Sequence, residues 1–77
     1  MVDIKLLWFT NGKVCIKCVP DGIEEDTFEL CLDVEKREIV SSTNLKYSNF
    51  ATHAAWKVYE TYEKTGTIPE KMFAAWY

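Results

Sequence analysis

The feature that most constrains this chain is one long amphipathic stretch, residues 47–66, with the sequence YSNFATHAAWKVYETYEKTG. At about 100° per residue its apolar side chains form one stripe, while Lys57, Glu60 and Lys64 fall on the opposite side. The stripe consists of Tyr47, Phe50, Ala51, Ala54, Ala55, Val58 and Tyr62. Its small alanines let a helix axis lie close to a sheet, so the stretch predicts a helix packed on one face of a β-sheet.

Four segments before this stretch carry strand signals, because they alternate and are rich in β-branched and aromatic residues. They are residues 2–9, 13–19, 27–34 and 38–41. Asn11-Gly12 predicts a tight hairpin between the first two, and Pro20-Asp21-Gly22 ends the second. Alternation places one set of side chains on the inner face: Ile4, Leu6, Trp8, Val14, Ile16, Phe28, Leu30 and Leu32. On the outer face it places Leu7, Phe9, Cys15, Val19, Cys31 and Val40, beside Lys5, Lys17, Glu29 and Asp33.

A capping-box pattern, Thr67-Ile68-Pro69-Glu70, predicts a short second helix at about 68–76. The chain is therefore expected to form a single α+β domain over residues 1–77. Its core would be a four-stranded antiparallel meander in the order 1-2-3-4, packed on the long helix. In the alternative arrangement, the first strand pairs elsewhere or exchanges between protomers.

The charge and cysteine content bound the partners and the compartment. With 9 basic and 12 acidic residues the formal charge is −3, which disfavours nucleic acid because phosphate binding needs clustered Lys and Arg. Cys15, Cys18 and Cys31 are odd in number, and the opening MVDIKLLWF resembles neither a secretory signal nor a membrane span. We therefore expect reduced thiols in a cytoplasmic protein that does not associate with membranes.

The apolar content exceeds what one sheet and one helix of this length can bury. Contiguous apolar surface usually marks a partner, so we predict a protein-interaction module that forms a homodimer or binds another protein. The candidate contact residues are Phe9, Cys15, Cys31, Trp56, Phe73, Trp76 and Tyr77. Alternatively, the terminal helix folds over Trp56 or the outer sheet face and hides this surface.

Other functions have weaker support in the sequence. Cys15, Cys18, Cys31 and His53 have the residue types of a zinc site, but positions three apart in a strand point to opposite faces. A redox Cys-x-x-Cys opens a helix, and none is expected after Cys18. No nucleophile, paired-carboxylate or phosphate-loop pattern accompanies His53, so we expect no enzyme, metal or cofactor. The alternative function is single-stranded nucleic-acid binding on the open sheet face, with Phe9 and Trp56 as stacking residues.

Overall fold

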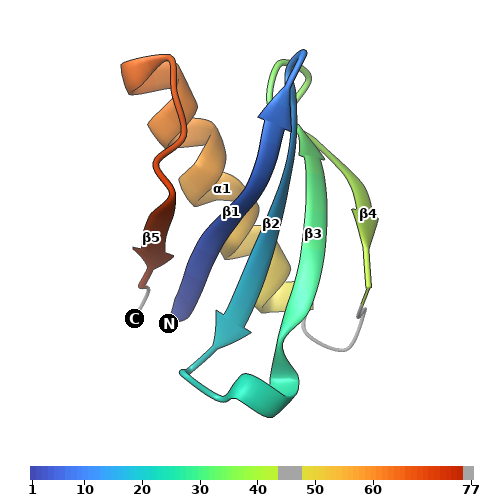
Figure 1. Ribbon diagram of the computed structural model, residues 1–77, viewed down its shortest axis with the longest axis vertical. Coiled ribbons are helices and arrows are strands. Elements are labelled where there is room, and N and C mark those ends of the chain that lie inside the picture. The colour runs from blue at the N-terminus through green and yellow to red at the C-terminus, as the bar shows by residue number, and fades with distance from the viewer. Residues whose placement is uncertain (44–47, 76–77) are drawn as a thin grey trace.

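The computed structural model describes residues 1–43 and 48–75 and has a two-layer α+β architecture (Figure 1). The elements are β1 (Val2–Thr10), β2 (Lys13–Pro20), a 3-10 turn η1 (Glu24–Asp26), β3 (Phe28–Asp33), β4 (Glu38–Ser42), α1 (Ser48–Thr65) and β5 (Lys71–Ala74). The strands form one antiparallel sheet in the order β4-β3-β2-β1-β5, and α1 crosses one face of it. The predicted class and the order of the first four strands are confirmed, but the sheet has five strands.

The short terminal helix was a wrong prediction, because its residues form β5 against β1. Within the described residues α1 is the only α-helix, and η1 is a single turn. The Leu6 N–H donates to the Glu70 carbonyl oxygen at 2.8 Å, and Met72 then lies opposite Ile4. Without β5, the outer row of backbone groups on β1 would be unpaired. A helix this short is marginal on its own, so sheet pairing outweighs the local capping pattern.

A bulge at Leu7 reverses the predicted orientation of the next two residues. Leu6 pairs with Ile16, but Trp8 pairs with Cys15, which leaves Leu7 as the extra residue of β1. Trp8 therefore lies on the outer face and is 48% exposed, whereas Phe9 turns inward. The prediction had placed Trp8 inside and Phe9 outside, and both placements were wrong for this one reason.

The long helix and the first hairpin follow the sequence closely. The helix α1 buries Ala51, Ala54, Ala55 and Val58 on the sheet, as the stripe predicts. Tyr47 lies outside the described residues. The Asn11-Gly12 turn has positive φ at both positions, 50° and 75°, which is the geometry that a two-residue hairpin requires.

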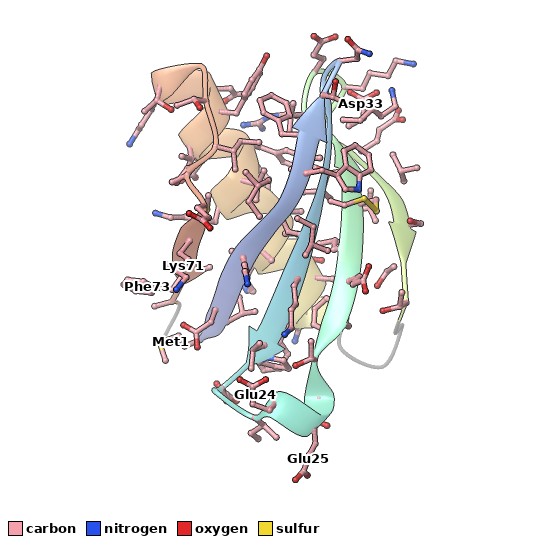
Figure 2. The ribbon with its side chains drawn as sticks, viewed as in Figure 1. Met1, Glu24, Glu25, Asp33, Lys71 and Phe73 are labelled. Carbon is pink, nitrogen blue, oxygen red and sulfur yellow. A yellow bond between two sulfur atoms is a disulfide. The ribbon has the colours of Figure 1, made fainter. Side chains whose placement is uncertain are left out.

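Two expectations for the outer face need comment. Asp33 is on the face that alternation predicts, opposite Lys13, but it is buried, and its carboxylate accepts hydrogen bonds from the backbone N–H groups of Glu35 and Lys36 and from Lys13 Nζ. Cys15 and Cys31, expected as reduced thiols, form a disulfide across β2 and β3 (Figure 2). They are directly opposite each other, with their Cα atoms 4.1 Å apart, so pairing of the strands itself brings the two sulfur atoms together.

Candidate functional site

The structure distributes the five described residues of the seven predicted contacts over different parts of the fold. Phe9 packs edge-to-face on Tyr62, with ring centroids 5.6 Å apart, and the disulfide leaves Cys15 buried. Trp56 and Phe73 are 50% and 57% exposed and line the same groove. Of the remaining three, Cys31 is bonded to Cys15, and Trp76 and Tyr77 lie outside the described residues. Whether any of the seven contacts a partner stays a prediction. Trp56 and Phe73 are the two that the fold brings to one groove.

This groove, which we call the β5 groove, runs between α1 and β5 and has a volume of about 630 Å³. It is lined by His53, Trp56, Lys57, Glu60 and residues 71–75. Lys57 and Glu60 give it one positive and one negative charge from the helix, beside the indole of Trp56. Its floor is an edge strand, because β5 is the last strand on that side of the sheet (Figure 1).

The free edge of β5 presents hydrogen-bonding groups. In an antiparallel ladder, successive residues alternate between bonding the neighbouring strand and pointing away from it. Leu6 bonds Glu70, so Met72 and Ala74 also bond β1, while the N–H and C=O of Lys71 and Phe73 point outward. Lys71 and Phe73 lie along the left margin of the sheet (Figure 2).

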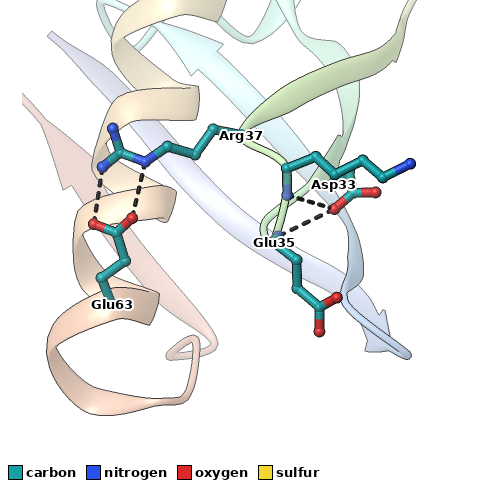
Figure 3. Close-up of polar contacts among 5 residues, drawn as sticks. Asp33, Glu35, Arg37 and Glu63 are labelled. Atoms are coloured by element: carbon teal, nitrogen blue, oxygen red, sulfur yellow. Dashed lines mark hydrogen bonds and ion pairs between the residues drawn. The ribbon is translucent and has the colours of Figure 1, made fainter.

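The other side of Trp56 is held by the turn between β3 and β4. The guanidinium of Arg37 lies 5.0 Å from the Trp56 ring centroid and 5.7 Å from that of Tyr59, and it binds Glu63 (Figure 3). Burial raises the pKa of the Tyr59 hydroxyl, and nearby Arg37 opposes that rise. Through these contacts Arg37 joins α1 to the β3–β4 turn, on the side of the sheet away from β5.

The outer sheet face carries a second surface that the sequence analysis missed. Lys5 lies directly opposite Lys71 on one side and Lys17 on the other, so three lysines form one row across β5, β1 and β2. We call this the lysine row. Lys17 in turn faces Glu29 of β3. A shallow depression of about 340 Å³ lies over the row, with Asp3, Val19 and Glu24 also on its walls.

The Leu7 bulge creates the lysine row. A two-residue turn at Asn11-Gly12 pairs residues whose numbers add to 23, which would set Lys5 opposite Cys18. The bulge shifts the remaining pairs to a sum of 22 and sets Lys5 opposite Lys17. The bulge could have been predicted from the sequence. With a two-residue turn, Ile4 and Leu6 lie opposite Cys18 and Ile16 only if β1 contains one extra residue.

The described residues offer little reactive chemistry. They contain no group of three or more His, Cys, Asp or Glu side chains able to hold a metal ion. Cys18 points into the core and Cys15 to the outer face, as strand alternation predicts. Burial raises the pKa of the Cys18 thiol to about 12, which keeps it in the unreactive protonated form.

Comparisons of the chain with protein-family models, curated proteins and solved structures give no significant match. In the part of the chain that the structure describes, no helix is long and apolar enough to cross a membrane.

Proposed function

We propose that the protein is a small interaction module that acts as a homodimer, joined through β5 and the β5 groove. The observation that carries the proposal is the free edge of β5, whose outward backbone groups lie directly beside an open groove. A second copy can add its own β5 antiparallel to this edge, which extends the sheet across a two-fold axis.

The edge alone is too short for a stable dimer. Only Lys71 and Phe73 of the four β5 residues point their backbone groups outward, which allows a few hydrogen bonds of about 1 kcal/mol each. A specific interface usually buries more than about 1,000 Å² in total, so the groove has to supply the remaining contact area. Half-exposed Trp56 and Phe73 are suited to that role, because aromatic residues at the centre of an interface contribute much of its energy.

The charges of the groove support a second copy of the chain as occupant. A two-fold axis beside β5 sets the groove of one protomer against the groove of the other. Lys57 and Glu60 are three positions apart on α1 and both line the groove, so Lys57 of each copy can face Glu60 of its partner. A surface that carries both signs in this arrangement is self-complementary.

The first test measures mass in solution by sedimentation equilibrium. We expect the wild type to sediment at twice the 9.0 kDa chain mass. Phe73→Pro removes an N–H that points away from β1, so it should dissociate the dimer and leave the fold intact. Phe73→Ala, the matched control for loss of the ring, keeps that N–H and should weaken the dimer less.

A charge swap makes the test specific for a second copy. Lys57→Glu sets two acids against each other across the axis and should dissociate the dimer, whereas Lys57→Glu with Glu60→Lys should restore it. A wild type that remains a monomer at all accessible concentrations overturns the proposal. A dimer that tolerates both Phe73→Pro and Lys57→Glu also overturns it, because the interface then lies elsewhere.

A further inference from the structure

The lysine row lies on the outer sheet face and meets the β5 groove at β5, where Lys71 and Phe73 belong to both surfaces. We propose that this outer sheet face binds single-stranded nucleic acid, with the lysine row on the phosphates and Trp8 and Phe73 as stacking platforms for bases. One protomer supplies every residue of this site, and in the proposed dimer, where Phe73 is covered, Trp8 is the stacking residue that stays exposed.

The arrangement of the three lysines is unfavourable for the isolated fold. Like charges directly opposite each other destabilise a sheet, and Lys5 faces a lysine on both sides. Within the described residues, the close ion pairs are Met1 with Asp21, Lys13 with Asp33 and Arg37 with Glu63, so none includes a lysine of the row. Glu29 lies opposite Lys17, but Lys5 has a lysine at both paired positions. A bound chain of phosphates would offset this repulsion.

Two exposed aromatic side chains flank the row along the strand direction. Phe73 lies opposite Asp3, on the row of residues before the lysines, and Trp8 lies opposite Cys15, on the far side of the bulge. Trp8 is 48% exposed and Phe73 is 57% exposed, and Phe73 also lines the edge of the β5 groove. A basic stretch with an aromatic residue on each side is the combination by which sheet surfaces hold single strands, since every base has a face that can stack.

The acidic residues near the row limit the size of the site. Asp3, Glu24 and Glu29 face the same surface, at the N-terminal end of β1, at η1 and on β3. They confine the favourable field to the strip over β5, β1 and β2, which is about 10 Å wide at ordinary strand spacing. We therefore expect a short site without base preference, and duplex DNA, whose bases cannot stack on the rings, should bind more weakly.

The test titrates the full chain into fluorescein-labelled oligouridylate and oligothymidylate and follows fluorescence anisotropy. We expect saturable binding, with the logarithm of the affinity falling against the logarithm of salt concentration with a slope of about −2 for three phosphate contacts. Trp8→Ala should weaken binding about tenfold. Lys5→Gln should weaken binding about fivefold and make the salt slope shallower by about 0.7.

Thermal unfolding of the same variants separates a binding role from a structural one. Lys5→Gln should raise Tm while it weakens binding, because it removes two like-charge contacts. Lys64→Gln, the charge-matched control at the end of α1, should change neither the affinity nor the salt slope.

Three outcomes overturn the proposal. The first is the absence of saturable binding at low salt. The second is equal binding of oligouridylate and inorganic polyphosphate with no effect of Trp8→Ala, which would indicate a general polyanion surface. The third is an equal loss of affinity in Lys64→Gln and Lys5→Gln, which would indicate nonspecific charge attraction.

Discussion

Arg37 and Glu63 join the β3–β4 turn to the last turns of α1 through two parallel hydrogen bonds, each 2.8 Å long. The same guanidinium stacks on Trp56 and Tyr59, so one side chain binds three positions of the helix. Apolar packing of Ala51, Ala54, Ala55 and Val58 holds the helix on the sheet elsewhere. Arg37 therefore adds a polar connection between α1 and the β3–β4 turn.

Arg37→Ala should lower the free energy of unfolding by about 1 to 2 kcal/mol, as the sum of a half-exposed ion pair and two cation–π contacts. Urea denaturation followed by far-UV circular dichroism measures this change. Arg37→Lys keeps the charge but loses the paired geometry, so it should recover less than half of the loss. Full recovery by lysine would mean that charge alone matters at this position.

The disulfide predicts a specific count of thiols. Without reductant, denatured protein should titrate one thiol per chain, that of Cys18, and reduction should raise the count to three. In the native protein Cys18 should resist alkylation, because burial raises its pKa to about 12. The bridge spans 16 positions, so its reduction should cost about 3 kcal/mol of stability. Three reactive thiols in unreduced protein would contradict the bridge.

Asp33 makes the fold sensitive to acid. The backbone N–H of Lys36 donates to its carboxylate and lowers the pKa; burial opposes this, and Lys13 adds to the lowering. Because the folded carboxyl binds its proton less tightly than the unfolded one, its stabilisation is present above the unfolded pKa. It is lost as the pH falls through the folded pKa. Tm should therefore decrease towards acid pH. Asp33→Asn should have a lower Tm at neutral pH, and its Tm should change less between neutral and acid pH. If Tm of the variant decreased towards acid pH as steeply as that of the wild type, other carboxylates would be responsible for the acid sensitivity.

Deletion of Leu7 should be tolerated. Leu6 and Trp8 would then be consecutive, and β1 would alternate regularly with the pairs that it already forms. We expect the free energy of unfolding to change by less than about 1 kcal/mol and Trp8 fluorescence to stay that of an exposed indole. Deletion of Lys5, the matched control, turns Ile4 outward and should unfold the domain. Loss of structure on deletion of Leu7 would mean that the fold requires the bulge itself.

The sequence predicted the elements whose signals are local. The alanine stripe of α1, the positive-φ hairpin at Asn11-Gly12 and the alternation of β3 each depend on residues that are close along the chain. The class and the order of the first four strands followed from these. The β5 groove was anticipated only through Trp56 and Phe73 as exposed aromatic residues.

The remaining features depend on partners distant in sequence. The segment after Gly66 has a convincing helix-start pattern, and only the open edge of β1 turns it into a strand. The Cys15–Cys31 bridge and the pairing of Lys5 with Lys71 require the register between strands that no short turn connects, which alternation alone does not supply. The bulge was the exception, because the turn and the two apolar faces already required one extra residue.

The pairing of Val2 with Ala74 joins the first strand to the last one along the chain. During synthesis, the outer edge of β1 stays uncovered until residues 71–74 have been made. A ribosome that stops before Lys71 would release a product with the hairpin and helix but an uncovered strand, which invites pairing with other nascent chains. Termination of the chain just before Lys71 should therefore yield inclusion bodies instead of functional protein.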